Sequence, residues 1–328
     1  MNTAEQLHKI SVAVASAPFL TQGGGGNTSV KSEGNMLIKA SGFRLDEITP
    51  ASGYVNVATA PIVNILKQGH NTNNPDKEIK QISQDAIIGD KTYLPSMETG
   101  FHAVLNNFVI HTHPVAVNAI LCCESAEQTL ASAMGNIPYV LLPYLNPGWY
   151  LSKAIADYQD IPSVIFLKNH GLIVHADTAE QAIQLHEKVI AVISAYTGLS
   201  NLPYPVLNKI NDNCYEWQDS ITDYFLNHSE SLAATLFPDQ AVVIGSDYLF
   251  TDDTGVKTQL LFNTTDKKCV INGSGNKAKA IAENLVALAA ILKYAESRQL
   301  RISNLPDDNV AYILGMDMEK YRQRILKG

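Results

Sequence analysis

Three histidines have the residue type and spacing that a catalytic metal site needs. His111 and His113 are two positions apart in the apolar segment FVIHTHP (108–114), which predicts a short strand. Because side chains alternate between the two faces of a strand, both imidazoles would project from one side and could bind one divalent cation. His170 follows the apolar run VIFLKN and would lie at the end of another strand, and three imidazoles leave a coordination position open for Lewis-acid catalysis. On spacing alone, the alternative that these are ordinary core histidines stays open.

A carboxylate that could work beside the metal is Glu98. The segment LPSMETGFHAVL (94–105) favours a helix whose cap lies at Pro95 and Ser96, with Glu98 in the first turn. Glu98 could ligate the metal, act as a general base, or alternate between these roles. The alternative is an acidic residue that merely interacts with the helix dipole.

A second set of residues has the character of a phosphate site. Four consecutive glycines open the segment GGGGNTS (23–29), and glycines allow backbone N–H groups to approach an anion closely. Neutral donors could come from Asn27, Ser29, Ser41 and Ser96, with Gly42 next to Ser41, and a flexible turn is the alternative for the glycines. Further positive charge could come from two nearby lysines, Lys31 and Lys39.

Composition and charge exclude several classes of protein. Hydrophobic residues make up 46% of the 328 residues, which is typical of a globular chain and not of a disordered one. The net charge of -8 opposes binding to a nucleic-acid backbone. No apolar run reaches the roughly 18 residues of a membrane span, and MNTAEQLHKI lacks the features of a signal peptide. Four scattered cysteines without a CxxC pair suit a reducing compartment, so we expect a cytoplasmic protein.

Strands that alternate with helices predict a mixed α/β or α+β fold for the first domain. A polar, proline-containing stretch at 200–213 suggests a boundary, with a catalytic domain at 1–200 and an α+β accessory or oligomerisation region at 201–328. Helices are expected at 3–18, 115–123, 178–197 and 277–297, with two short ones in 305–326, and strands are expected at 36–42, 139–144, 163–175, 241–250, 259–263 and 268–272.

Five segments, in this order, resemble the class II aldolase/adducin family, which includes fuculose-phosphate and rhamnulose-phosphate aldolases. They are GGNTSVK (25–31), IKASG (38–42), PSMETGFH (95–102), VIHTHP (109–114) and KNHGLIV (168–174). The resemblance implies a three-layer α/β/α sandwich around a mostly antiparallel sheet, commonly assembled as a homotetramer.

The resemblance also implies roles for individual residues. His111, His113 and His170 match the metal-binding histidines, usually of zinc but also of other divalent metals such as Mn²⁺ or Co²⁺. Glu98 matches the catalytic acid/base. The positions that contact substrate phosphate are matched by Asn27, Ser41, Gly42 and Ser96.

These roles predict a lyase that cleaves or forms a carbon–carbon bond in a small sugar phosphate through a metal-stabilised enediolate. Epimerases, dehydratases and decarboxylases of the same family use the same metal and base, so these reactions stay open. A third alternative is a non-catalytic, adducin-like interaction module, although such domains tend to lack the metal histidines that are all present here.

Two further features qualify the resemblance. Many family members carry a second serine directly before the glutamate, where this chain has Met97, which removes one hydroxyl from the phosphate pocket. The segments LFPDQAVVIG (236–245) and LGMDMEKYRQRIL (314–326) resemble longer members that are sometimes fused to a short-chain dehydrogenase. Because the chain ends before such a domain could begin, no nicotinamide cofactor is expected.

Overall fold

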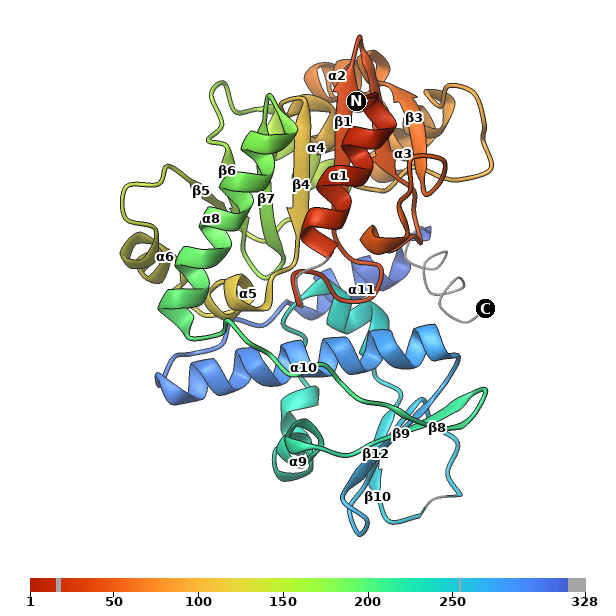
Figure 1. Ribbon diagram of the computed structural model, residues 1–328, viewed down its shortest axis with the longest axis vertical. Coiled ribbons are helices and arrows are strands. Elements are labelled where there is room, and N and C mark those ends of the chain that lie inside the picture. The colour runs from red at the N-terminus through yellow and green to blue at the C-terminus, as the bar shows by residue number, and fades with distance from the viewer. Residues whose placement is uncertain (16–18, 254, 318–328) are drawn as a thin grey trace.

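A seven-stranded sheet forms the centre of the larger part of the molecule. Residues 1–15, 19–253 and 255–317 are described by the computed structural model (Figure 1). The strand order is β3-β2-β1-β4-β7-β6-β5. All neighbours pair antiparallel except β5 and β6, which are parallel, so the prediction of a mostly antiparallel sheet is confirmed. The strands are β1 (Asn27–Ser32), β2 (Asn35–Lys39), β3 (Tyr54–Ala58), β4 (Phe108–Thr112), β5 (Val140–Leu142), β6 (Val164–Leu167) and β7 (Gly171–Ala176).

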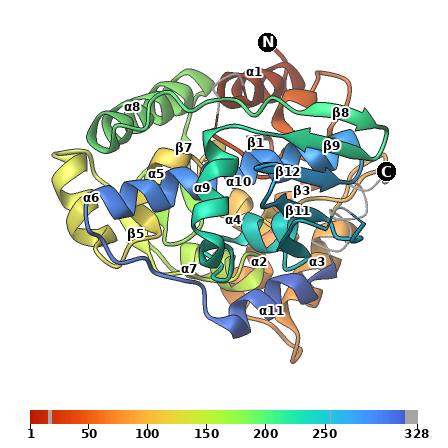
Figure 2. The ribbon, with the colours of Figure 1, turned by 90° about the horizontal axis from the view of Figure 1, so that it is seen from below.

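Helices cover both faces of this sheet and produce the predicted α/β/α layers. Helices α1 and α8 lie on one face, and α2, α4 and α7 lie on the other (Figure 2). The strands therefore carry apolar residues on both sides: Val30 and Ile110 pack beneath α1 and α8, whereas Val109 and Ile173 pack beneath α4 and α7. The helices of this part are α1 (Thr3–Ala15), α2 (Thr59–Gln68), α3 (Pro75–Asp85), α4 (Thr99–Val104), α5 (Val115–Leu121), α6 (Ala126–Met134), α7 (Trp149–Ala156) and α8 (Ala179–Thr197), with the 3-10 turn η1 (Leu45–Glu47).

A long helix, α10 (Gly275–Ser297), lies between this sandwich and a second, smaller sheet (Figure 1). Leu285 and Leu288 of α10 belong to the same buried cluster as Val117 and Ile120 of α5, so the two parts share one core. The second sheet has the order β10-β11-β12-β9-β8. Its strands and the remaining helices are β8 (Asn208–Asn211), β9 (Cys214–Trp217), α9 (Ser220–Asn227), η2 (Ser229–Leu232), η3 (Gln240–Ile244), β10 (Tyr248–Thr251), β11 (Leu260–Asn263), β12 (Lys268–Asn272) and α11 (Asp307–Gly315).

Several predicted elements need correction. The strand expected at 241–250 is wrong, because residues 240–244 form the π-helical turn η3 and strand β10 begins only at Tyr248. A short apolar run does not distinguish a strand from a buried helical turn, and every residue of η3 is buried. The expected strand 163–175 is two strands, β6 and β7, joined by a turn at 168–170. The ends of the expected helices 3–18 and 305–326 fall outside the described residues.

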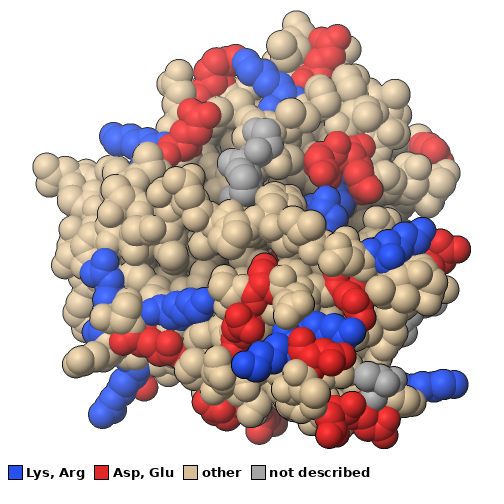
Figure 3. Space-filling view, turned by 60° about the horizontal axis from the view of Figure 1, so that its bottom comes forward, with Lys and Arg blue, Asp and Glu red and all other residues tan. Residues whose placement is uncertain are grey.

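Surface and thiol features complete the description. On the face shown in Figure 3, acidic and basic side chains are interspersed, so the charges drawn there form no continuous field of one sign. The four cysteines have free thiols: Cys122, Cys123, Cys214 and Cys269. Among the described helices, none combines the length and the apolar character that a membrane crossing requires.

Candidate metal centre

The predicted metal residues converge on one buried point. His111, His113, His170 and Glu98 each offer a ligand atom, and these atoms all lie within 4.8 Å of one another. Nε2 of His111 is 3.0 Å from Nε2 of His113, and Oε1 of Glu98 is 3.2 Å from Nε2 of His111. Nε2 of His170 lies 3.7 Å from the same carboxylate oxygen. Residues separated by more than seventy positions in the chain therefore form one cluster.

Strand ends and tight turns hold these side chains in place. His111 lies in the central strand β4, and His113 follows that strand directly. His170 lies in the β6–β7 turn, where Asn169 has a left-handed φ of 56° and Nδ2 of Asn118 donates to the His170 carbonyl oxygen at 3.1 Å. A Cβ at Gly171 would lie 2.4 Å from the Thr112 carbonyl oxygen, so only glycine lets this turn approach β4.

Glu98 occupies a different helical position from the one expected. The sequence predicts it in the first turn, but it is the N-cap residue of α4, which begins at Thr99. The side chain of Ser96 instead accepts a hydrogen bond at this helix end, because the Glu98 N–H donates to Oγ of Ser96 at 3.2 Å. The carboxylate is therefore not used to cap the helix and points into the histidine cluster.

The other ring nitrogens of two histidines are held by acceptors. Nδ1 of His111 lies 2.9 Å from the carbonyl oxygen of Leu172, so Nδ1 carries the proton and donates. Nδ1 of His113 lies 2.6 Å from Oδ2 of Asp239. In the neutral form of each ring, these contacts leave Nε2 as the unprotonated atom that faces the cluster, which is the usual arrangement of metal-binding histidines. Nδ1 of His170 has no hydrogen-bond partner within the described residues.

A cavity of about 60 Å³ opens beside the cluster. It is lined by Glu98, His113 and His170, by the glycines of the 24–26 run, and by three of the predicted phosphate residues, Ser41, Gly42 and Ser96. The fourth predicted residue, Asn27, pairs with His111 across β1 and β4. Its amide is buried, and neither the nitrogen nor the oxygen has a hydrogen-bond partner in the part of the chain that the structure describes.

The two lysines of the sequence prediction have different positions. Lys39 lines the cavity, and its Nζ donates to the carbonyl oxygens of Gly24 at 3.2 Å and Phe43 at 2.7 Å. Lys31 does not line the cavity and instead donates to the carbonyl oxygen of His102. The structure thus brings one of the two ammonium groups to the cavity.

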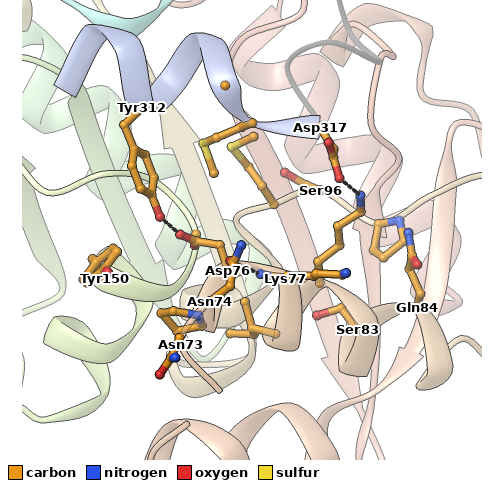
Figure 4. A pocket seen from close by; sticks show the side chains of 18 of the residues that line it. Asn73, Asn74, Asp76, Lys77, Ser83, Gln84, Ser96, Tyr150, Tyr312 and Asp317 are labelled. Atoms are coloured by element: carbon orange, nitrogen blue, oxygen red, sulfur yellow. Dashed lines mark hydrogen bonds and ion pairs between the residues drawn. The ribbon is translucent and has the colours of Figure 1, made fainter. Parts of the chain in front are cut away.

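A larger pocket of about 430 Å³ adjoins this cavity (Figure 4). Both are lined by Ser96 and Met97, so the 95–97 segment separates the two spaces. Helix α3 and the end of α11 form opposite walls of the larger pocket, where the Tyr312 hydroxyl donates to Oδ2 of Asp76. Next to them, Nζ of Lys80 pairs with Asp317 at 3.1 Å.

Comparison with known proteins decides the family. The family described as Class II Aldolase and Adducin N-terminal domain matches residues 6–197, more than half of the chain. The chain belongs to this family. The predicted resemblance is therefore confirmed, and the matched range ends where α8 ends.

Individual relatives of this class II aldolase family member cover different shares of it. A segment of 202 residues is 30% identical to "Uncharacterized oxidoreductase YuxG" of Bacillus subtilis (strain 168). This match covers 58% of this chain and 28% of the Bacillus protein. The N-terminal class II aldolase domain of a conserved protein from Thermoplasma acidophilum is 27% identical, with a TM-score of 0.53, over 60% of this chain and 93% of that one. An L-fuculose 1-phosphate aldolase is 20% identical, with a TM-score of 0.41, over 59% of this chain and 84% of that one. The chain thus spans under a third of the length of its Bacillus relative, which fits the predicted similarity to longer, dehydrogenase-fused members.

The donor set and its electrostatics fit the divalent metal that class II aldolases use. Burial raises the pKa of Glu98, but His111 and the other two histidines lower it by more, so the carboxyl is ionised. Burial lowers the pKa of His170 far below its usual value, which keeps that imidazole neutral. Burial also lowers the pKa of His111, but the adjacent Glu98 raises it by more. Neutral imidazoles and an ionised carboxylate are the forms that ligate a metal, which would displace the His111 proton.

The structure adds a residue that sequence reasoning missed. Asp239 lies outside the matched family range, is buried, and contacts His113 across 126 positions of sequence. The only signal in the sequence is an acidic residue in the apolar stretch LFPDQAVVIG, and nothing in its spacing points to a histidine.

Proposed function

We propose that this family member is a divalent-metal-dependent lyase that cleaves or forms a carbon–carbon bond in a small sugar phosphate. The observation that carries the proposal is the convergence of three imidazole Nε2 atoms and the Glu98 carboxylate on one buried point. Beside it lies a cavity lined by Glu98, His113 and His170 together with Ser41, Gly42 and Ser96. His111, His113 and His170 would hold the metal. When bound, the metal supplies Lewis-acid stabilisation of the negative charge that develops on substrate oxygen atoms as the bond breaks.

Glu98 is suited to move a proton in this reaction. Its carboxylate is buried, ionised and part of the cavity wall, so it can reach a carbon atom bound there. Because Glu98 also contacts two of the histidines, it can serve as a metal ligand when no substrate is bound.

The phosphate end of the substrate would bind next to the glycine run. Ser41, Gly42 and Ser96 offer neutral donors there, and the buried amide of Asn27 has no other partner in the described residues. The buried ammonium of Lys39 adds positive charge at the same wall, which favours an anion even though Met97 supplies no hydroxyl. Binding energy from the phosphate would then orient the reacting end of the sugar.

The larger pocket supports a substrate that extends beyond the metal. The inner cavity of about 60 Å³ is too small for a whole sugar phosphate, whereas the adjoining pocket of about 430 Å³ has the size of an ordinary ligand site. We therefore place the remainder of the substrate between α3 and α11, past the 95–97 segment (Figure 4).

The proposal extends to the resident metal and the assembly. Zinc is the proposed ion because imidazole and carboxylate ligands with an open position suit a catalytic zinc site. A homo-oligomer, a cytoplasmic location and a division into domains 1–200 and 201–328 are carried over from the sequence prediction.

The test is the metal dependence of turnover. Purified protein should lose cleavage of a panel of ketose 1-phosphates after treatment with a chelator and regain it with Zn²⁺, Mn²⁺ or Co²⁺. His111→Ala should abolish activity, whereas His228→Ala, at a histidine outside the cluster, should not. Activity that survives both the chelator and His111→Ala would refute the proposal. Product analysis by NMR separates lyase products from those of an epimerase, a dehydratase or a decarboxylase.

A further inference from the structure

A carboxylate from the C-terminal part of the chain is built into the metal centre. Asp239 directly precedes the π-helical turn η3 and is 2% exposed. Its Oδ2 lies 2.6 Å from Nδ1 of His113, on the side of the ring opposite the cluster. The residues that match the family end at 197, so this contact comes from outside the family domain.

Two separate segments are shaped around this contact. The turn before Asp239 is fixed by Gln240, whose Oε1 accepts from the Leu236 N–H at 2.8 Å and whose Nε2 donates to the Ala234 carbonyl oxygen at 2.7 Å. From the other side, the glycine run passes so close that a Cβ at Gly25 would lie 2.5 Å from Oδ2 of Asp239 and 2.9 Å from Nδ1 of His113. Position 25 therefore accepts only glycine while the pair is intact.

The chemistry of the pair points to a role in metal binding. A carboxylate that accepts the Nδ1 proton holds the imidazole in the tautomer whose Nε2 lone pair faces the ion, and it makes that nitrogen a stronger donor. The other two histidines lack this feature, because His111 donates to a carbonyl oxygen and Nδ1 of His170 has no hydrogen-bond partner within the described residues. Of the three rings, His113 is the one with a carboxylate behind it.

We propose that Asp239 is the positioning residue of the metal centre, so that the region after residue 197 completes a site that the family domain alone leaves without this carboxylate. The inference rests on the proposed metal centre and adds a requirement for the C-terminal part. It also assigns to Gly25 a steric role in metal binding, in addition to any contact with substrate.

The experiment measures metal affinity and not turnover. Wild type, Asp239→Asn and Asp239→Ala are titrated with Zn²⁺ against a competing chelator, and the Co²⁺ forms are compared by visible absorption. We expect affinity to fall about ten- to hundredfold in Asp239→Asn and at least as far in Asp239→Ala, with a shifted Co²⁺ spectrum. Gly25→Ala should also lower the affinity for Zn²⁺, although this substitution removes no polar group.

Glu283→Gln is the matched control. Glu283 is also a buried carboxylate of the C-terminal part, and it accepts from the Gly23 N–H at 2.7 Å, but it contacts none of the four clustered residues. Glu283 also pairs with the Arg44 guanidinium, so its replacement can lower stability without touching the cluster. The affinity of Glu283→Gln for Zn²⁺ should therefore stay within about threefold of wild type, a difference of less than about 1 kcal/mol. Thermal unfolding of the metal-free proteins establishes that each variant is folded.

Two outcomes would overturn the inference in distinguishable ways. The positioning role is wrong, while the metal centre stands, if wild type binds Zn²⁺ tightly and Asp239→Asn binds it equally well with an unchanged Co²⁺ spectrum. The same conclusion follows if Glu283→Gln lowers the affinity for Zn²⁺ as much as Asp239→Asn does. If wild type binds no divalent metal, the proposed function fails and the inference fails with it.

Discussion

Thr112, the last residue of β4, lies between the clustered histidines His111 and His113 but points to the opposite face of the sheet, where its Oγ1 is 2.8 Å from Nε2 of His186 on α8. Strand alternation therefore sends His111 and His113 toward the candidate metal centre and Thr112 toward a helix. His186 is 1% exposed, so this neutral contact ties α8 to the strand that carries two of the proposed ligands.

Acid should destabilise the fold in part through His186. Burial lowers the pKa of this imidazole from its ordinary value of 6.5 to about 4. Between these two values the unfolded chain binds more protons than the folded chain, so the free energy of unfolding falls as the pH falls from 6.5 toward 4. Between pH 7 and pH 5, the free energy of unfolding of His186→Gln should therefore fall by about 2 kcal/mol less than that of wild type. Urea unfolding at both pH values checks this, with chelator in all samples, and a pH dependence equal to that of wild type would contradict it.

Replacing the Glu98 carboxylate by an amide should separate metal binding from proton transfer. Glu98→Gln keeps the size of the side chain, and His111, His113 and His170 remain to hold the ion. Removal of a general acid/base lowers turnover by about 10²–10⁴-fold. We expect a loss of kcat in this range with most of the bound metal retained, measured by steady-state kinetics and metal analysis. Activity within tenfold of wild type would exclude Glu98 as the proton-transfer group.

Met97→Ser should strengthen the binding of phosphorylated substrates. Met97 lines the inner cavity beside Ser96, where a hydroxyl could donate to a phosphate oxygen. One added hydrogen bond of about 1 kcal/mol corresponds to a roughly fivefold lower KM. Ser96→Ala is the matched variant and should raise KM by a similar factor. Both effects should vanish with the dephosphorylated sugar, and equal effects on both substrates would show that neither residue contacts phosphate.

Removal of Arg44 from its ion pair with Glu283 should destabilise the fold strongly, because the carboxylate left behind is buried. The guanidinium lies 3.1 Å from Oε1 of Glu283, and the two side chains are 23% and 2% exposed. Arg44→Leu would leave the carboxylate without its close guanidinium partner, which costs about 3 kcal/mol in unfolding free energy.

A surface pair provides the contrast for that measurement. Lys9 and Glu180 pair on the surface with 37% and 62% exposure, so Lys9→Leu should leave the unfolding free energy nearly unchanged. Equal destabilisation by Arg44→Leu and Lys9→Leu in urea titrations would contradict the importance of the buried carboxylate.

Five short sequence segments were sufficient to identify the family, and that resemblance implied the layers and the roles of the four clustered residues. The alternation of side chains along a strand predicts that His111 and His113 share a face, and the capping residue Thr178 with the apolar period after it predicts α8. These features depend on residues a few positions apart, so they can be read directly from the chain.

The details that only the tertiary structure decided involve residues distant in sequence. The run at 240–244 forms a buried π-helical turn, and its residue types alone do not distinguish this turn from a buried strand. Asp239 reaches His113 because α10 joins the C-terminal part to the core of the α/β/α sandwich. No local sequence pattern predicts this contact. Spacing along a strand is a property of the backbone, whereas the pairing of a carboxylate with an imidazole 126 residues away depends on how the whole chain packs.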